Sequence, residues 1–225
     1  MKNEGEEEMK KLIIFGGNGI GMVAASVAND LGFYEVIGFL NDVVPTGSTI
    51  GKFKKISVIG KTEDYKKYLA DQNTYFFIGY VGLQDEKNTF EKIEQLNIPE
   101  DRWATLIHPT SIIPKGFCDI GTGVLFAPLV QLSPDTKISD NCILLANSFV
   151  GHDTFLDKFA HVATNGVVGA NVHVGKAVHI GSNATVREKV KIGDYSLIGS
   201  GAVVLSDVAE NSICVGNPAR LLKQR

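Results

Sequence analysis

Residues 149–198 read FVGHDTFLDKFAHVATNGVVGANVHVGKAVHIGSNATVREKVKIGDYSLI and carry an apolar residue at every sixth position. A period of six fits neither the 3.6-residue period of a helix nor the two-residue alternation of a strand. It is the period of a hexapeptide parallel β-helix, in which each hexad forms one short face and a corner. The register extends in both directions without a break, through Ile120, Phe126, Leu132, Ile138, Leu144, Val150, Leu156, Val162, Val168, Val174, Ile180, Val186, Ile192, Ile198 and Val204.

Three hexads close one triangular coil of eighteen residues, so these fifteen positions predict five coils. The large apolar residue of each hexad points inward, and a small or β-branched residue four positions later fills the space beside it. Neighbouring coils satisfy each other's backbone groups and bury each other's faces. We therefore expect residues 107–225 to form an all-β parallel β-helix domain with a C-terminal tail.

The segment before the repeats follows a different pattern. Short apolar runs predict strands at 12–15, 36–40 and 75–81, and helical spacing follows the glycine turn 16–21 and recurs at 86–96. Strands that alternate with helices indicate βαβ units and a parallel sheet. We expect a Rossmann-like α/β domain at residues 11–106, preceded by a flexible lead-in at residues 1–10.

Composition excludes several classes of protein. A formal net charge of −3 leaves no general basic surface for nucleic acid. Cys118, Cys142 and Cys214 are odd in number and lack metal-ligand spacing, which argues against a disulfide framework and a zinc site. The apolar run LIIF near the N-terminus is far too short to span a membrane. We expect a soluble protein of the reducing cytoplasm.

His152 and Asp153 form the first candidate site. His152 comes two places after the inward Val150, so its side chain should project outward near a corner, with Asp153 beside it. A carboxylate can fix the tautomer of an imidazole and stabilise its protonated form, which makes His152 a candidate general base. The alternative is a surface pair without a catalytic role.

His161 lies nine residues after His152, which is half a coil. The two imidazoles should therefore lie on different sides of the prism and could meet only between subunits. This spacing suggests a homotrimer with sites in its interfaces. His161 and His179 are one coil apart and should form a column with the strand spacing of about 4.7–4.9 Å. The alternative, which is favoured for His173 and His179, is that they are solvated corner residues.

Four outward histidines also raise the alternative of a zinc-dependent hydro-lyase on the same β-helix. Such a site needs three imidazoles that converge on one metal with an open position. The spacings of nine, twelve and six residues among these histidines do not bring them to one point. We expect no metal site.

The glycine turn GGNGIG spans residues 16–21, and Met22 stands where a dinucleotide fingerprint requires its third glycine. A redox cofactor is therefore not expected. A tight turn at a helix N-terminus can still hold a phosphate, and Asp42 follows the second strand where a carboxylate can meet a ribose or base. Gly82 would line the same edge. The alternative is a set of ordinary turn glycines.

Taken together, the glycine-turn domain, the motifs HD and AHVA nine residues apart and the tail VGNPAR resemble the bacterial sugar O-acyltransferase family that includes sialic-acid O-acetyltransferases. The similarity covers residues 11–220 and is greatest to the nucleotide-4-amino-sugar N-acetyltransferases. It implies a left-handed β-helix, a homotrimer with acetyl-CoA between adjacent prisms, and a nucleotide sugar held by the N-terminal domain.

The resemblance also implies roles for single residues. His152 would take a proton from the sugar amine, Asp153 would raise its basicity, and His161 would contact the acetyl thioester. Acetyl-CoA would further meet Ala170, Ser182, Ser200, Pro218 and Arg220. The nucleotide sugar would meet Asn18, Gly19, Ile20, Asn41, Asp42 and Gly82.

The sequence differs from members of this family at residues that would contact the nucleotide sugar. Many of them have histidine at Ile20 and an acid at Asn41, and the loop after Ile78 is one residue longer here. The expected activity is N-acetylation of the 4-amino group of a UDP-, dTDP- or GDP-linked 4-amino-4,6-dideoxy sugar. The alternatives are O-acetylation of a sugar hydroxyl and a non-catalytic trimeric scaffold that binds sugar nucleotides.

Overall fold

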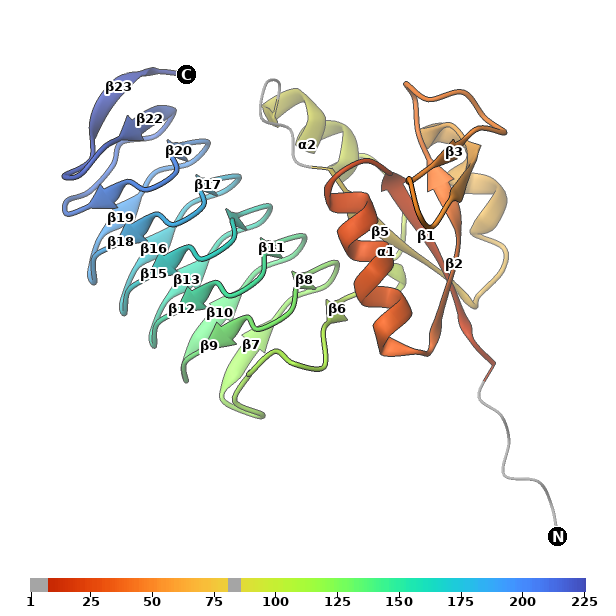
Figure 1. The fold of residues 1–225 in the computed structure, drawn as a ribbon, viewed down its shortest axis with the longest axis horizontal. Helices are drawn as coiled ribbons and strands as arrows, with labels where there is room; N and C mark the ends of the chain where they lie inside the picture. Colours follow the sequence, from red (N-terminus) through yellow and green to blue (C-terminus); the bar gives the residue numbers. More distant parts are fainter. Residues whose placement is uncertain (1–7, 81–85) are drawn as a thin grey trace, which may run out of the picture. The chain divides into compact units, whose positions relative to one another are not determined.

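The structure is a computed structural model that describes residues 8–80 and 86–225. The chain forms two compact units that divide between residues 80 and 81 (Figure 1). The expected domain boundary after residue 106 falls inside the second unit.

The first unit is a five-stranded sheet with the strand order β3-β4-β2-β1-β5. The strands β1, β2, β4 and β5 run parallel, and β3 runs antiparallel to β4. The strands predicted at 12–15 and 36–40 lie within β1 and β2, and the predicted helix is α1. The elements are β1 (Lys10–Gly16), α1 (Ile20–Leu31), β2 (Tyr34–Leu40), β3 (Thr49–Ile50), β4 (Ile56–Gly60), the 3-10 helix η1 (Thr62–Tyr68) and β5 (Thr74–Gly79).

Glycines allow α1 to pack close to the sheet. A Cβ atom on Gly79 of β5 would lie 2.6 Å from the Cα atom of Gly21 in α1, so side chains at these positions would push helix and strand apart. The helix ends at Gly32, whose φ of 75° is in the left-handed region and whose N–H donates to the carbonyl of Asn29. The short hairpin β3–β4 was not expected, because two-residue strands leave little alternation in the sequence.

The second unit begins with α2 (Glu86–Glu94) and the 3-10 helix η2 (Glu100–Arg102), followed by a triangular solenoid (Figure 1). The β7 face is the sheet of β7 (Cys118–Ile120), β10 (Thr136–Ile138), β13 (Phe155–Leu156), β16 (His173–Val174) and β19 (Lys191–Ile192). The β9 face contains β9 (Gln131–Leu132), β12 (Phe149–Val150), β15 (Val167–Val168), β18 (Thr185–Val186) and β21 (Val203–Val204). The β8 face contains β6 (Leu106–Ile107), β8 (Leu125–Phe126), β11 (Ile143–Leu144), β14 (His161–Val162), β17 (His179–Ile180), β20 (Leu197–Ile198), β22 (Ser212–Val215) and β23 (Arg220–Gln224).

The hexad register is confirmed throughout the solenoid. Strands β7 to β21 make five coils of three strands each, and residues eighteen apart pair in parallel, for example Val150 with Val168. The inward apolar residues form one continuous buried core. The small residues four positions later are buried beside them, as at Thr154 and Ala184. The resulting fold is an all-β left-handed parallel β-helix that follows an α/β N-terminal unit.

The corners of the solenoid repeat a left-handed backbone conformation. Non-glycine residues with φ near +60° recur at every sixth position from Leu129 to Tyr195. Asn and Asp tolerate this conformation better than most residues, and they occupy it at Asp135, Asn141, Asn147, Asp153, Asn165, Asn171 and Asn183. Asp153 therefore has a structural task in its turn, whatever its chemical role.

Helix α2 packs on one edge of the solenoid. The rings of Phe90 and Phe159 stack with their centroids 4.4 Å apart, and Lys176 makes hydrogen bonds of 2.9 and 3.0 Å to both carboxylate oxygens of Glu94. These contacts explain why residues after 86, which the sequence assigned to the N-terminal domain, belong to the same compact unit as the repeats.

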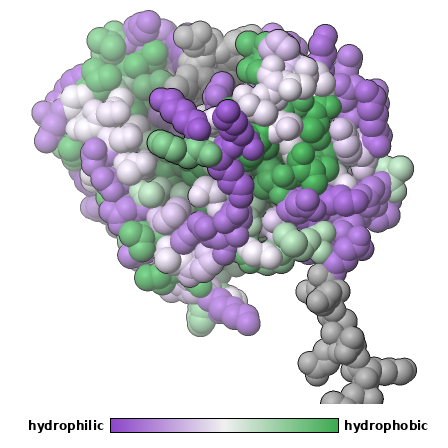
Figure 2. All heavy atoms as spheres, turned by 45° about the vertical axis from the view of Figure 1, so that its right-hand side comes forward, coloured by the Kyte–Doolittle hydropathy of each residue, from purple (hydrophilic) through white to green (hydrophobic). Residues whose placement is uncertain are grey.

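The surface carries hydrophilic and hydrophobic residues side by side in the view of Figure 2. No helix among residues 8–80 and 86–225 is long and apolar enough to cross a membrane.

Candidate active site

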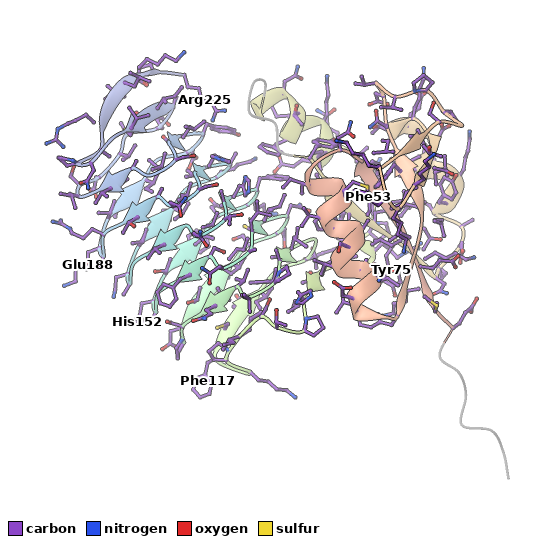
Figure 3. All side chains as sticks on the ribbon, in the orientation of Figure 1. Phe53, Tyr75, Phe117, His152, Glu188 and Arg225 are labelled. Atoms are coloured by element: carbon purple, nitrogen blue, oxygen red, sulfur yellow. The ribbon has the colours of Figure 1, made fainter. Side chains whose placement is uncertain are left out.

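His152 and Asp153 lie in the turn after β12, on the edge of the prism between the β9 and β7 faces, which we call the His152 edge. The Nδ1 atom of His152 is 2.6 Å from the Oδ2 atom of Asp153, and the two side chains are 58% and 54% exposed. His152 points away from the solenoid (Figure 3). The predicted outward pair is therefore present and open to a ligand.

The geometry of this pair defines a tautomer. If Nδ1 carries the proton and donates it to Asp153, the Nε2 atom is left as an acceptor on the far side of the ring. An imidazole held in this way can accept a proton at Nε2, and the adjacent carboxylate stabilises the positive charge that results. The pair can thus act as a general base.

His161 and His179 form the expected column on the β8 face, where they pair in register on β14 and β17. Their rings meet edge to face with centroids 4.5 Å apart. His161 is only 6% exposed, and within the described residues both of its ring nitrogens lack a hydrogen-bond partner, as does Nδ1 of His179. His179 is thus not the solvated corner residue that the alternative described.

Burial controls the charge of both rings. It lowers the pKa of His161 to about 3, with a further contribution from His179. It also lowers the pKa of His179 to about 4, with a contribution from the positive charge of Arg225. Both imidazoles are therefore neutral near pH 7, and His161 can offer a hydrogen-bond donor but no positive charge.

His152 and His161 lie on different sides of the prism, as their spacing predicted. His173 lies on the β7 face, so the four outward histidines do not converge within one chain. Among the residues that the structure describes, no group of three or more His, Cys, Asp or Glu side chains could hold a metal ion.

The residues predicted to meet acetyl-CoA fall into two groups. Ala170 lies one coil after His152 on the same edge, and the N–H of the following Asn171 donates to the carbonyl of His152. Ser182 and Ser200 lie on the edge between the β8 and β9 faces, which we call the Asn165 edge. His161 on the β8 face precedes this edge.

Close approach of successive coils explains two glycines beside these groups. A Cβ atom on Gly151 would lie 2.6 Å from the amide nitrogen of Ala170, and one on Gly181 would lie 2.6 Å from that of Ser200. Side chains there would separate the coils. Because the coils approach closely, backbone N–H groups recur once per coil along the His152 edge and along the Asn165 edge, where a ligand could contact them.

Pro218 and Arg220 lie at the C-terminal end of the solenoid, apart from the His152 pair along the prism. Arg220 is exposed and lines a cavity of about 290 Å³ with residues such as Val204 and Asp207. Its Nη1 atom donates to the carbonyl of Ala219. The guanidinium keeps further donors for an anion.

In the first unit, Asn18, Gly19 and Ile20 surround the N-terminus of α1. Gly19 occupies the N-cap position with φ of 59°, and no side chain in the described part of the chain caps the helix there. The first turn contains no acidic residue. Uncapped N–H groups at a helix N-terminus favour a phosphate.

The side chains of Asn41 and Asp42 are engaged within the unit. Asn41 donates from Nδ2 to the carbonyl of Gly16 at 2.7 Å, and its Oδ1 accepts from the N–H groups of Val43 and Val44. Asp42 accepts from the N–H and the hydroxyl of Thr62 at the start of η1. Gly82, the third predicted contact, lies outside the described residues.

Tyr80 is not among the predicted site residues, but it follows β5 at the same edge of the sheet as the glycine turn. Its ring packs against Gly16, because a Cβ atom on that glycine would lie 2.9 Å from Cδ1 of Tyr80. The only signal in the sequence was its place near the end of the strand predicted at 75–81.

Two family models match the chain. Residues 11–93 match the PglD N-terminal domain, and residues 171–206 match the bacterial transferase hexapeptide model of six repeats. The first match ends within α2, although α2 packs with the solenoid.

Solved structures resemble nearly the whole chain. The acetyltransferase domain of PglB from Neisseria gonorrhoeae FA1090 is 27% identical with a TM-score of 0.82, over 95% of this chain and 100% of that one, and a second structure of it contains acetyl coenzyme A. An H141N mutant of perosamine N-acetyltransferase from Caulobacter crescentus, in complex with CoA and GDP-perosamine, is 21% identical with a TM-score of 0.83, over 95% and 97% of the two chains. WeeI from Acinetobacter baumannii AYE is 18% identical with a TM-score of 0.68, over 94% and 99%.

The last two similarities are evidence of fold, whereas the PglB domain matches in fold, in length and in sequence. The two family matches and the similarity to the PglB acetyltransferase domain together indicate the class of enzyme. The chain is an acyltransferase with a left-handed β-helix, and a segment that matches the PglD N-terminal domain precedes its hexapeptide repeats.

Proposed function

We propose that the chain is an acetyl-CoA-dependent N-acetyltransferase that acts on the 4-amino group of a nucleotide-linked 4-amino-4,6-dideoxy sugar. The observation that carries this proposal is the exposed His152–Asp153 pair, with its 2.6 Å contact between Nδ1 and Oδ2. The similarity to the PglB acetyltransferase domain supports the acyl donor. The fold shared with perosamine N-acetyltransferase supports an amino-sugar acceptor.

In this reaction the neutral sugar amine attacks the carbonyl carbon of the thioester. Nε2 of His152 accepts the proton that the nitrogen loses as the C–N bond forms, while Asp153 stabilises the imidazolium. A backbone N–H group stabilises the tetrahedral oxyanion. The C–S bond then breaks, and the proton passes from His152 to the departing sulfur of CoA. Transfer is direct, since Ser148 is buried and Cys142 is an inert core thiol whose pKa is raised by burial.

The working form in this proposal is a homotrimer. The β9 face lies between the His152 edge and the Asn165 edge, and its outward Phe149 and Val167 are 37% and 36% exposed. If three copies turn their β9 faces toward a common axis, the His152 edge of each copy meets the Asn165 edge of the next. A heterologous interface of this kind closes into a ring.

The trimer would complete each site from two subunits. His152, Asp153 and Ala170 come from one copy, and His161, Ser182 and Ser200 come from its neighbour. Acetyl-CoA would extend along the cleft toward the C-terminal end, where Pro218 and Arg220 would meet its nucleotide portion. This arrangement explains why the predicted residues occupy two edges of one prism.

The nucleotide sugar is assigned to the first unit. Asn18, Gly19 and Ile20 would place backbone N–H groups of the α1 N-terminus at its phosphates. Asp42 remains a candidate for ribose or base recognition, and Asn41 would act through the loop that it holds. The role of Gly82 stays a prediction.

A thiol-release assay with acetyl-CoA tests the proposal. UDP-, dTDP- and GDP-linked 4-amino sugars would be compared with the same sugars bearing a 4-hydroxyl. Free CoA that appears only with an amino sugar supports N-acetylation and names the nucleotide. Release with hydroxyl sugars would favour O-acetylation, and no release across the panel would favour a scaffold that only binds sugar nucleotides.

A further inference from the structure

We infer that Tyr80 is a nucleotide-binding residue, whose ring and hydroxyl contact the nucleoside diphosphate above the carboxyl ends of β1 and β5. The inference rests on the proposed function and adds to it a residue that recognises the nucleotide. It depends on the sheet topology, on the packing of Tyr80 against the glycine turn, and on the hydrogen bonds that engage its neighbours.

Topology places Tyr80 where a parallel sheet binds ligands. Helix α1 leads from β1 to β2 in one direction along the sheet, whereas the chain crosses from β4 to β5 on the other side of β1. The winding thus reverses between β1 and β5. Ligands of open α/β sheets bind at such a switch point, outside the carboxyl ends of the strands. Gly16 and Gly79, the last residues of β1 and β5, pair with each other there.

Packing holds the ring of Tyr80 at this point. Gly16 has φ of 105°, and a Cβ atom on it would approach Cδ1 of Tyr80 to 2.9 Å. The ring therefore rests on the backbone of the turn that leads to the N-terminus of α1. A phosphate bound at that N-terminus would bring the rest of a nucleotide close to the ring.

The polar neighbours of Tyr80 are less suited to bind a ligand. The side chain of Asn41 is held by backbone groups: it donates to the carbonyl of Gly16 and accepts from the N–H groups of Val43 and Val44. Both carboxylate oxygens of Asp42 accept from Thr62. Within the described residues, no hydrogen bond engages the hydroxyl of Tyr80, although the side chain is partly buried.

The environment also keeps the hydroxyl protonated. Burial, with repulsion from the charge of Asp42, raises the pKa of Tyr80 to about 12. The phenol is thus a permanent hydrogen-bond donor near pH 7. A donor suits ribose and phosphate oxygens, and the aromatic ring can stack on any base because every base has a π-face.

Binding of UDP, dTDP and GDP to the full chain, measured by titration calorimetry, tests this inference without turnover. Tyr80→Phe removes only the hydroxyl, and we expect it to weaken binding of the preferred nucleotide by roughly tenfold. Tyr80→Ala also removes the stacking surface, and we expect a loss of about a hundredfold. Tyr75→Phe, at the opposite end of β5, is the matched control and should bind as the unchanged chain does.

The outcomes separate this inference from the proposed function. Normal nucleotide binding by both Tyr80 variants, with unchanged thermal unfolding, would overturn the role of Tyr80 alone. Failure of the unchanged chain to bind any of the three nucleotides would overturn the nucleotide-linked substrate, and the role of Tyr80 with it. Acetyl-CoA binding should be equal in all variants.

Discussion

The solenoid and the N-terminal unit use asparagine in opposite ways. In the solenoid, Asn147, Asn165 and Asn183 repeat at intervals of eighteen and donate to one another along the edge at 2.8 and 3.1 Å. In the N-terminal unit, Asn41 belongs to no repeat, and it links its own loop, through the N–H of Val43, to the carbonyl of Gly16 in β1. In a repeat, the residue type that the structure requires recurs at a fixed interval in the sequence. A residue that differs from the repeating type can therefore be recognised from the sequence alone. Outside a repeat, only the contacts reveal what a polar residue does.

His152 is such a departure within the repeats, and its replacement should have the largest effect. We expect His152→Ala to lower kcat by about 10²–10⁴-fold, because a positioned general base contributes this much. His173→Ala, an outward histidine on another face, should retain full activity. Steady-state thiol release measures both, and near-normal turnover of His152→Ala would refute its role as base.

A substitution at Asp153 can distinguish the structural role of this residue in its turn from a chemical role of its carboxylate. Asparagine tolerates the left-handed backbone of Asp153, so Asp153→Asn keeps the turn while it removes the charge. Lowered turnover with unchanged thermal unfolding would therefore assign a chemical role to the carboxylate in addition to its place in the turn.

The repeat rule itself can be tested on two adjacent residues of β13. Leu156 points inward and is fully buried, whereas Phe155 points outward and is partly exposed. Leu156→Ala should lower the free energy of unfolding by about 2–5 kcal/mol, because it leaves a cavity in the core. Phe155→Ala should cost less. Urea unfolding measures both, and equal losses would contradict the inward and outward assignment.

The buried histidine pair makes stability depend on pH. The pKa of His161 is lowered to about 3 and that of His179 to about 4, from an ordinary value of 6.5. As the pH falls below 6.5, the unfolded chain binds protons that the folded imidazoles do not, so stability falls until the folded pKa values are reached. We expect each ring to cost roughly 2 kcal/mol between pH 6.5 and pH 5.

Urea unfolding at pH 7 and pH 5 measures this dependence. His179→Gln removes one titrating ring, so the difference between the two pH values should shrink by about the share of that ring. An unchanged difference would mean that His179 titrates alike in the folded and unfolded chain, and it would contradict the lowered pKa of this ring.

The sequence predicted the solenoid to the residue, since an inward position recurs every six residues and a shift of one would reverse every side chain. It also predicted that His152 and His161 lie on different sides of the prism. It could not predict that His161 is buried against His179, with both ring nitrogens of His161 lacking a hydrogen-bond partner within the described residues, because the six-residue period does not encode how side chains on the outer face pack. Nor could it show that α2 packs with the repeats through Phe90 and Glu94.

The N-terminal unit was predictable only in outline. Apolar runs located β1, β2, β5 and α1, but the β3–β4 hairpin is too short to leave a period. Asn41 was expected to contact the nucleotide because it directly follows a predicted strand. Its hydrogen bonds to Gly16, Val43 and Val44 are formed only after folding, and no local pattern encodes them.

Substitutions at Asn41 test whether this single asparagine has the structural role that its contacts indicate, and we expect their effects to be the smallest. If its task is to hold the loop, Asn41→Ala should lower the free energy of unfolding by about 1–3 kcal/mol, the cost of leaving partly buried polar groups without partners. Asn41→Asp keeps the acceptor for Val43 and Val44 but sets a carboxylate against the carbonyl of Gly16, so it should also destabilise the chain. Thermal unfolding and nucleotide titration should be measured on the same samples. A normal unfolding temperature combined with weakened nucleotide binding would contradict the structural role and return Asn41 to the set of residues that read the ligand.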